Sequence, residues 1–363
     1  MNLHKTGIVL LALLLAAIAM VPIVSAEEQT MSVDNFSLSV LKPNNAQQGV
    51  VIQNGFSLST GDNAKVIPVG SIIQHSENGI TRVFDSEGKQ LLLSKDSDSP
   101  KVLTPIGYVS AVDVNQIPDG SYVQENTNGI TNVFLNDNRI LTVISSNKTS
   151  QKNVPVPSTN GWVEDSFARG IPQLGQFIAD WNVPSSPPNK STGAVDFLFN
   201  AIQPSTENGI VQPVLEYNHE GTHQWTGAAW YGDSNGQYYR SNPFTTAVGH
   251  TIRGTLGWNT KLSRWNIIVQ DLNNGGSTSS FSTNAPNVGT NNVEAYCALE
   301  GWYINNNNDI SGKTTFTNMR FRDVNLNPVS FSWNKYVSTN MGLTNLDVTW
   351  NGMSPVTLWT KNP

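Results

Sequence analysis

The sequence contains one cysteine, Cys297, so no disulfide can form within a single chain. Only 13% of its 363 residues are charged, the formal net charge is −6, and no cluster of Lys and Arg is interleaved with aromatic residues. Nucleic-acid binding depends on such clusters, because basic side chains neutralise phosphates. We therefore expect a core that is stable without covalent cross-links, and we do not expect a nucleic-acid partner.

Long apolar runs are also scarce, since only one occurs and it lies near the N-terminus. Lys5 precedes an apolar stretch from Ile8 to Val24, and small residues follow up to Ala26. This order is typical of a secretory signal peptide, and we predict one over residues 1–26. A retained membrane anchor is the alternative, because about 20 apolar residues span a bilayer. With cleavage after Ala26 we expect a secreted or cell-surface protein without a membrane span in its mature chain, whereas a retained anchor would hold the chain at its N-terminus.

No stretch of the sequence shows the apolar period of an amphipathic helix. Asn, Ser, Thr and Gly separate short apolar runs instead, which is typical of an all-β protein. Within the run WNIIVQ, the residues Trp265, Ile267 and Val269 share one face, as a half-buried antiparallel strand requires. Beyond residue 155 we predict strands at 177–183, 195–202, 210–217, 228–231, 251–256, 265–270, 293–304, 314–321 and 356–359. Their number and spacing favour a β-sandwich or barrel.

A repeat with an offset of 50 residues occupies the N-terminal part. The sequence IPVGS at 67–71 recurs as IPDGS at 117–121, and NGITRVF at 78–84 recurs as NGITNVF at 128–134. Each copy is typical of two strands joined by an Asn-Gly turn. A linker rich in Ser, Asn and Pro follows at 146–160. We predict an N-terminal module at 27–155, either a pro-segment, a wall-binding module or a spacer, and a sandwich domain at 156–363.

The sequence HEGTH at 219–223 matches the two-histidine zinc pattern of metalloproteases. That chemistry needs a helix that puts both imidazoles on one face. The motif contains Gly221 and joins two predicted strands, so we expect a hairpin loop instead. The third histidine of the extended motif is absent, because Ala229 stands in its place. We expect no metal and no other cofactor.

Two of the predicted strands carry polar residues within apolar surroundings. The two-residue period of a strand puts Gln212 and Glu216 on one face, and it puts Glu294, Glu300 and Trp302 on one face of the other strand. An ionisable side chain among apolar neighbours is costly unless it is paired or functional. A solvent-exposed face of a sandwich would show the same pattern, so the pattern alone leaves both interpretations open.

Three stretches resemble, in order, the glutamic peptidases of the scytalidoglutamic (eqolisin) type. FIADWNVP at 177–184 resembles the opening strand of that domain, IVQPV at 210–214 the strand with the catalytic glutamine, and ALEGW at 298–302 the strand with the catalytic glutamate. The resemblance spans roughly residues 161–325 and implies a concanavalin-like antiparallel β-sandwich. It implies Gln212 and Glu300 as the catalytic pair, with Glu294 as the alternative acid. The cleft would be lined by Glu216, Trp230 and Trp302.

The resemblance implies hydrolysis of a polypeptide in acid by an activated water. Glu300 would take a proton from the water and return it to the leaving amine, and the Gln212 amide would donate to the developing oxyanion. The alternative is a non-catalytic sandwich that binds an extracellular glycan or a surface, because a fold does not fix a function. The tryptophans available for a sugar-stacking platform are Trp225, Trp230, Trp258, Trp265 and Trp302.

Overall fold

The computed structural model describes residues 161–360 apart from three single positions, and short stretches between residues 49 and 145. The predicted signal peptide and the predicted linker lie outside the described residues. The chain divides into two compact units. The first comprises Met1–Val102, Tyr108–Ser150 and Asn235–Gln237, and the second comprises Leu103–Gly107, Gln151–Ser234 and Tyr238–Pro363.

The first unit contains the repeat, which is a structural repeat as well as a sequence repeat. One copy is β4 (Ile72–Ser76), β5 (Ile80–Phe84) and β6 (Gln90–Lys95), and the other is β10 (Ser121–Glu125), β11 (Ile130–Phe134) and β12 (Ile140–Ser145). The register also repeats, since Ile72 lies opposite Phe84 in one copy and Tyr122 lies opposite Phe134 in the other. Both copies have a bulge at the end of their middle strand, just before Phe84 and Phe134.

The other described strands that begin before residue 120 are short. They are β1 (Gly49–Val51), which pairs with β4, the paired strands β2 (Phe56–Leu58) and β3 (Lys65–Ile67), the paired strands β7 (Lys101–Thr104) and β8 (Gly107–Ser110), and β9 (Val114–Ile117).

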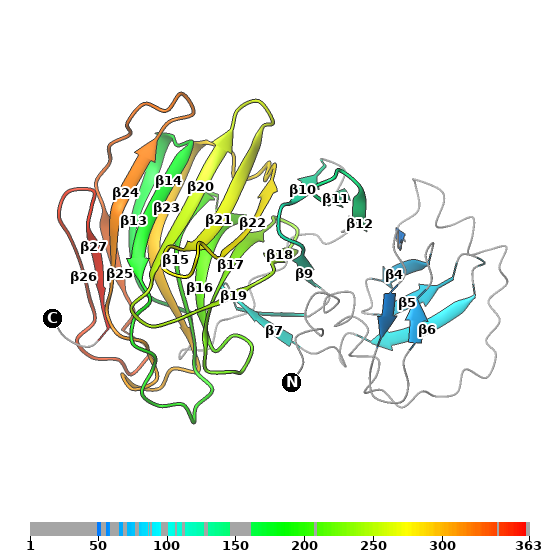
Figure 1. The fold of residues 1–363 in the computed structure, drawn as a ribbon, viewed down its shortest axis with the longest axis horizontal. Coiled ribbons are helices and arrows are strands. Elements are labelled where there is room, and N and C mark those ends of the chain that lie inside the picture. The colour runs from blue at the N-terminus through cyan, green and yellow to red at the C-terminus, as the bar shows by residue number, and fades with distance from the viewer. Residues whose placement is uncertain are drawn as a thin grey trace. The chain divides into compact units, whose positions relative to one another are not determined.

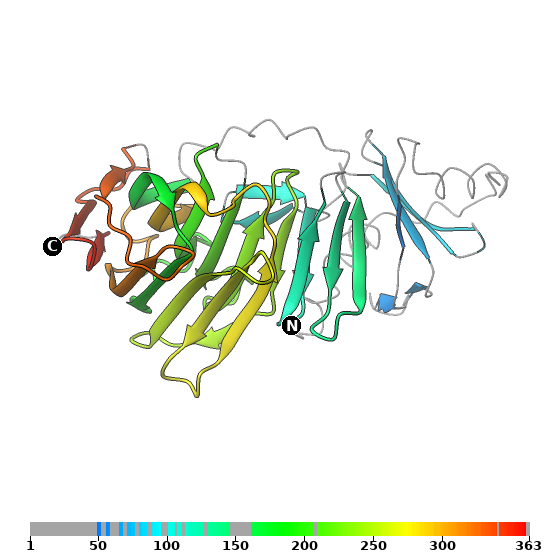
Figure 2. The same ribbon diagram turned by 90° about the horizontal axis from the view of Figure 1, so that it is seen from above.

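The second unit is an antiparallel β-sandwich, which confirms the predicted all-β fold class. Its first sheet has the strand order β22-β21-β20-β14-β24-β27-β26, and its second has the order β25-β13-β23-β15-β16-β17-β18, with β19 also paired to β17. Figures 1 and 2 show the sheets as two layers. The first sheet consists of β14 (Gln176–Asn182), β20 (Thr251–Asn259), β21 (Arg264–Asp271), β22 (Thr278–Thr283), β24 (Thr314–Arg322), β26 (Asp347–Trp350) and β27 (Val356–Trp359). The second consists of β13 (Gly161–Gln173), β15 (Val195–Pro204), β16 (Ile210–Tyr217), β17 (Trp225–Gly232), β18 (Tyr238–Ser241), β19 (Phe244–Thr246), β23 (Asn291–Trp302) and β25 (Asn334–Val337).

Strand β13 is the largest element that the sequence pattern did not predict. It contains Glu164, Asp165 and Ser166 in succession, which breaks the apolar alternation of a half-buried strand. All three residues are nonetheless buried, because β13 is paired on both edges, with β23 and with β25. Tertiary pairing therefore overrides the local polar composition.

The two sheets approach each other closely at Gly254 on β20. A Cβ atom at this position would lie 2.1 Å from Asn200 Oδ1 and 2.8 Å from both Pro213 Cγ and Trp181 Cη2. Asn200 and Pro213 belong to the second sheet, so glycine is required where these side chains cross the interface. The predicted alternation on β21 also holds, because Trp265, Ile267 and Val269 are fully buried.

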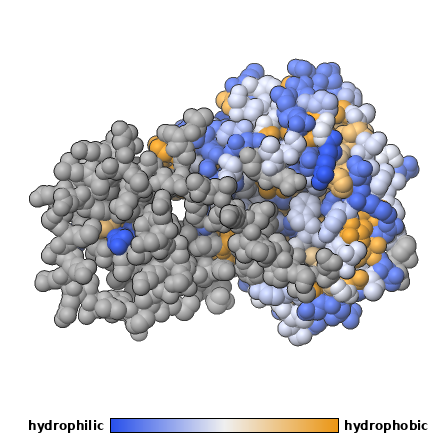
Figure 3. Space-filling model, turned by 180° about the vertical axis from the view of Figure 1, so that it is seen from behind, coloured by the Kyte–Doolittle hydropathy of each residue, from blue (hydrophilic) through white to orange (hydrophobic). Residues whose placement is uncertain are grey.

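The face of the sandwich seen in Figure 3 is mostly hydrophilic, with separate small hydrophobic patches. The most exposed large apolar side chains are scattered along the chain, at Val248, Leu262 and Leu326. Within the part of the chain that the structure describes, no helix has the length and apolarity needed to cross a membrane.

We predict that Gly254→Ala destabilises the sandwich by about 1 to 3 kcal/mol, because the added methyl group overpacks the interface between the sheets. Gly257→Ala, on the same strand, is the matched control, since a Cβ there would meet no atom within 4 Å. The control should be neutral or stabilising by a few tenths of a kcal/mol. Urea unfolding followed by tryptophan fluorescence measures both, and equal losses in the two variants would contradict the packing at Gly254.

Candidate active site

The second sheet turns one face toward the first sheet and the other face away from it. Asn200 on β15 and Pro213 on β16 lie against Gly254, so their strand neighbours point to the opposite face. We call this opposite face the outer face. It carries Phe197, Phe199, Gln212, Glu216, Trp230, Arg240, Glu294, Glu300 and Trp302. The face assignments made from the two-residue period agree with this register.

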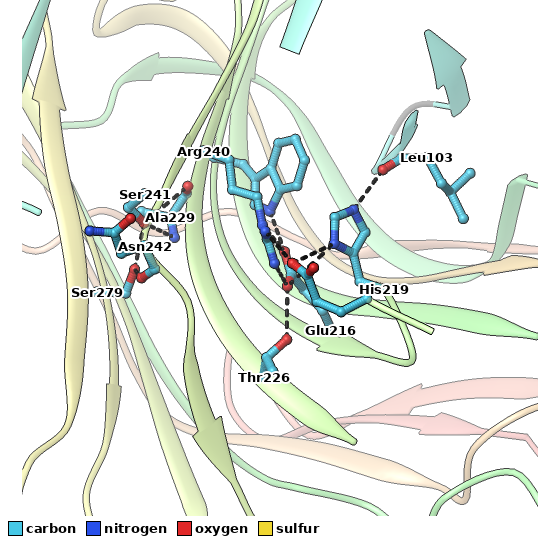
Figure 4. Close-up of polar contacts among 11 residues, drawn as sticks. Leu103, Glu216, His219, Thr226, Ala229, Arg240, Ser241, Asn242 and Ser279 are labelled. Atoms are coloured by element: carbon cyan, nitrogen blue, oxygen red, sulfur yellow. Dashed lines mark hydrogen bonds and ion pairs between the residues drawn. The ribbon is translucent and has the colours of Figure 1, made fainter. Parts of the chain in front are cut away.

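Glu216 is the most heavily bonded carboxylate on the outer face (Figure 4). Arg240 holds it with two hydrogen bonds, Nε to Oε1 at 3.0 Å and Nη2 to Oε2 at 2.5 Å. Trp230 Nε1 donates to Oε1 at 2.6 Å, and Thr226 Oγ1 donates to Oε2 at 2.9 Å. Burial opposes ionisation of Glu216, but the charge of Arg240 outweighs it and holds the pKa below its usual value. Glu216 is therefore a buried anion whose hydrogen-bonding capacity is fully used.

The predicted hairpin loop between β16 and β17 extends this network. The motif 219–223 is a loop in the structure, as expected, with Asn218, Gly221 and His223 at positive φ. Glu220 accepts from Arg240 Nη1 at 2.7 Å. His219 Nδ1 lies 3.7 Å from Glu220 Oε1 and 4.0 Å from Glu216 Oε2. The loop thus supplies groups to the outer face.

Electrostatics set the protonation state of Glu220. Its partial burial opposes ionisation, but the neighbouring His219 and Arg240 outweigh the burial and lower the pKa to about 2. Glu220 therefore remains anionic in mild acid, and Arg240 lies between Glu216 and Glu220 as their cationic partner.

Glu300 contrasts with Glu216, because it is equally buried but almost unbonded. It is fully buried, and neither carboxylate oxygen accepts a well-formed hydrogen bond within the described residues. Burial raises the pKa of Glu300 well above its usual range, and the charge of Asp165 raises it further, while the Trp162 side chain lowers it slightly. Asp165 lies opposite Ala298, two residues from Glu300 on the same face. Burial raises the pKa of Asp165 to about 7.

Glu294 is occupied by other partners. Gln203 Nε2 donates to its Oε2 at 3.2 Å, the Tyr296 hydroxyl donates to the same oxygen, and Arg169 Nε lies 3.4 Å from Oε1. Glu294 is held by three neighbours, whereas Glu300 is not. The two acids that the sequence left as alternatives therefore differ in how free they are to bind a water molecule.

Gln212 also has unused hydrogen-bonding capacity, since its Nε2 is buried without a partner. Gln212 and Glu300 belong to strands separated by β15. Glu300 lies opposite Phe197, which lies opposite Glu216. Gln212 is therefore on the second strand from Glu300, and it precedes Glu216 by four residues on β16.

The same displacement occurs once more on this face, between Glu216 and Arg240. Glu216 is four residues from Gln212 on β16, and Gln212 lies opposite Trp230, which lies opposite Arg240. Arg240 is thus two strands across from Glu216 and four residues along, in the same sense as Gln212 from Glu300. The twist of the sheet brings such diagonal partners together, because Arg240 and Glu216 are hydrogen-bonded at 2.5 to 3.0 Å. Glu294 lies on the opposite diagonal from Gln212.

The register relates Gln212 to Glu300 as it relates Arg240 to Glu216. Arg240 reaches Glu216 partly through Nε, which lies 3.0 Å from Oε1 and is four bonds from Cα, as glutamine Nε2 is. A glutamine on this diagonal is therefore long enough to approach the facing carboxylate.

One end of the outer face contacts residues from much earlier in the sequence. Leu103 O lies 2.8 Å from His219 Nε2, as Figure 4 shows. A Cβ atom on Gly107 would lie 3.0 Å from the Trp302 ring. Trp302 is two residues from Glu300 on β23 and is 2% exposed.

Sequence reasoning missed Arg240, Asp165 and the role of His219. Arg240 had a readable signal, because it is a charged residue within the otherwise apolar and aromatic run YYRS. Asp165 had none, since β13 itself was not predicted. His219 attracted attention only as a zinc ligand, and no group of three or more metal-binding side chains occurs among the described residues.

Four of the five tryptophans considered as a sugar-stacking platform are buried, since Trp225, Trp230, Trp265 and Trp302 are at most 3% exposed. The fifth, Trp258, is half-buried on β20 of the first sheet. Trp225 lies on β17 and Trp302 lies on β23, both in the second sheet. Trp265 lies on β21 in the first sheet. These side chains contribute to packing, and Trp230 contributes a hydrogen bond to Glu216.

No family model and no curated protein matches the chain. Among solved structures, scytalido-glutamic peptidase with a peptide-based transition-state analogue has a TM-score of 0.42 and 17% identity, covering 56% of this chain and all of that chain. SCP-B, a member of the eqolisin family in complex with the tripeptide Ala-Ile-His, has a TM-score of 0.40 and 17% identity over the same shares. These are distant similarities of fold, so a function has to be proposed from the residues of the outer face.

We predict that Arg240→Met destabilises the protein by about 3 to 5 kcal/mol, because it leaves the Glu216 charge buried and unpaired. The double variant Arg240→Met with Glu216→Gln should recover most of the loss. Lys335→Met is the control, since its ion pair with Asp347 is exposed and should contribute less than about 1 kcal/mol. Urea unfolding measures all three. Equal losses for Arg240→Met and the control would show that the buried pair does not hold the face.

A second prediction concerns the pH dependence of stability. The pKa of Asp165 is raised from 3.8 to about 7 in the folded protein. Below pH 3.8 both states are protonated, whereas between 3.8 and about 7 only the unfolded chain ionises, so stability falls as the pH rises. At about 1.4 kcal/mol per pKa unit, Asp165→Asn should gain up to roughly 4 kcal/mol over wild type at pH 7. It should gain nothing near pH 3, and a pH-independent difference between the two proteins would contradict the raised pKa.

Proposed function

We propose that the sandwich is an acid endopeptidase in which Glu300 and Gln212 hold the water that attacks a peptide bond. The observation that supports this proposal most is their shared geometry. Both side chains are buried on the outer face with unused hydrogen-bonding capacity. The register-equivalent pair Glu216 and Arg240 is in direct contact.

The chemistry follows from the two groups. Ionised Glu300 takes a proton from the water as the water adds to the scissile carbonyl, and it then returns that proton to the leaving amine. The Gln212 Nε2 group donates a hydrogen bond to the oxygen that gains negative charge. Because the amide carries no charge, it does not compete with Glu300 for the proton.

The ionisation of Glu300 depends on whether water reaches its carboxyl group. Burial raises its pKa, so a covered Glu300 keeps its proton and cannot act as a base. Access of water would bring the pKa back toward the usual value of about 4.3, and the carboxylate would then be ionised in mild acid. Because the pKa of Asp165 is raised to about 7, Asp165 is neutral in mild acid and adds negative charge beside Glu300 only at higher pH.

The remaining groups of the outer face serve as a frame. Glu216 and Arg240 neutralise each other, and their register relation is the same as that of Glu300 and Gln212. Trp230 and Trp302 are apolar walls on the same face, which suits the side chains of a polypeptide better than a glycan that needs exposed rings. The peptidase proposal therefore has more support than the glycan-binding alternative.

We also propose that the protein acts outside the cytoplasm. It is supported by the signal-peptide pattern of residues 1–26. N-terminal sequencing of exported protein would test it, and a mature chain that still begins with the apolar stretch would contradict it.

We predict that Glu300→Gln abolishes cleavage of an unfolded protein substrate between about pH 3 and about pH 7, because it removes the base and keeps the size of the side chain. Gln212→Ala should lose about 10²- to 10³-fold in kcat, since it removes one oxyanion donor. Both effects are measured with the purified full chain, by the rate of new amino termini. Circular dichroism verifies that each variant is folded.

Glu294→Gln is the control, because Glu294 lies on the outer face but is held by Gln203, Tyr296 and Arg169. It should keep most of the activity. An inactive Glu294→Gln beside a fully active Glu300→Gln would move the base to Glu294. No cleavage by any variant, wild type included, would leave the non-catalytic binding module as the better interpretation.

A further inference from the structure

The hairpin turn between β7 and β8 contacts the outer face, although it lies well over 100 residues before His219 in the sequence. Leu103–Gly107 groups with the sandwich unit. Leu103, Thr104, Pro105 and Gly107 are all buried, and Thr104 Oγ1 donates to Gly107 O at 2.8 Å, which closes the turn. We call this turn the hairpin tip.

His219 binds the hairpin tip through the main chain. Its Nε2 lies 2.8 Å from Leu103 O, and a carbonyl oxygen can only accept, so Nε2 carries the proton. The other ring nitrogen faces Glu220 and Glu216. The ring also packs edge-on against Phe197 and Trp230, with centroids 5.7 Å from each. His219 is thus fixed on all sides and presents one N–H donor to a peptide carbonyl.

Trp302 packs against the tip at Gly107, which has no side chain. Gly107 lies so close to the indole that a Cβ would be 3.0 Å from Cη2 and 3.5 Å from Cζ2. Gly107 also has a φ of +123°, which L-residues rarely adopt. A larger residue at this position would have to displace the ring or lift the tip. The indole therefore selects glycine at this point.

We propose that His219 and Trp302 form a peptide-binding subsite beside Glu300, and that the hairpin tip is its built-in occupant. His219 donates to a main-chain carbonyl, and Trp302 accepts a residue without a bulky side chain close to that carbonyl. The subsite rests on the proposed peptidase function for its role in catalysis, since a substrate would have to displace the tip. The contacts that define it do not depend on that function.

Because the tip belongs to the same chain, even a low-affinity tip can occupy the subsite. The effective concentration of a tethered segment at its site is set by the length and stiffness of the connection. A substrate therefore competes with the tip, and its apparent affinity falls by the fraction of molecules in which the subsite is open. Glu300 is itself buried and lies two residues from Trp302 on β23.

The test uses the full chain with Gly107→Leu, which should lift the tip from Trp302. Hydrogen exchange at the amides of the hairpin tip, read by mass spectrometry, should accelerate at least about tenfold. Gly193→Leu is the matched control, because Gly193 also has a positive φ, +70°, but its Cβ would meet nothing within 4 Å. Unchanged exchange in Gly107→Leu, or equal acceleration in the control, would overturn the proposed subsite.

A synthetic peptide with the sequence of residues 101–110 tests the chemistry of the subsite without an activity assay. By calorimetry it should bind Gly107→Leu at least about tenfold more tightly than wild type, because the tethered tip no longer competes. A version with leucine in place of the glycine should not bind. Adding His219→Ala should weaken binding about threefold to tenfold, as expected for one hydrogen bond, and His219→Gln, which keeps an N–H donor, should restore part of it.

The outcomes separate the two proposals. Peptide binding as described, with no cleavage by any variant, would leave the subsite in place and overturn the peptidase. Cleavage by wild type, with equal binding of the glycine and leucine peptides, would overturn the subsite and leave the peptidase in place. If both hold, Gly107→Leu should lower KM for an unfolded substrate at least about threefold, since the competing occupant has been removed.

Discussion

The ion pair between Arg240 and Glu216 lies on the outer face, and the arrangement of that face depends on it. Two buried charges are tolerated there because Arg240 neutralises Glu216 and Trp230 and Thr226 complete the hydrogen bonding. Their contact also reveals which diagonal of the twisted sheet is short. The same register relation connects Gln212 to Glu300, the proposed reactive pair.

The two pairs differ in charge, and that difference separates structure from chemistry. Arginine neutralises Glu216 and closes the diagonal with an ion pair. Glutamine carries no charge, so Glu300 has no cationic partner on its diagonal, and burial raises its pKa. A buried acid with unused lone pairs costs stability, and such costs are concentrated at functional sites.

The sequence predicted those parts of the fold that depend on local pattern. Strand β16 was predicted with its observed bounds, and the 50-residue repeat predicted two equivalent meanders, because both signals arise from neighbouring residues. The two-residue period also put Gln212 and Glu300 on definite faces. It could not show that β15 lies between their strands, because strand order is set by pairing across about 90 residues. Asp165 entered the site by the same kind of long-range pairing, and it lies in a strand whose polar composition hid it. Arg240 entered by the local hairpin pairing of β17 with β18, where it lies opposite Trp230.

The central claim is that Glu300 and Gln212 bind one water between them. A crystal structure of the full chain in mild acid, at a resolution that shows ordered water, tests it most directly. The account predicts that the carboxylate of Glu300 and the amide nitrogen of Gln212 lie roughly 5 Å apart with one water bonded to both, at about 2.8 Å from each. A direct contact between the two side chains, or a separation that needs two or more waters, would contradict it.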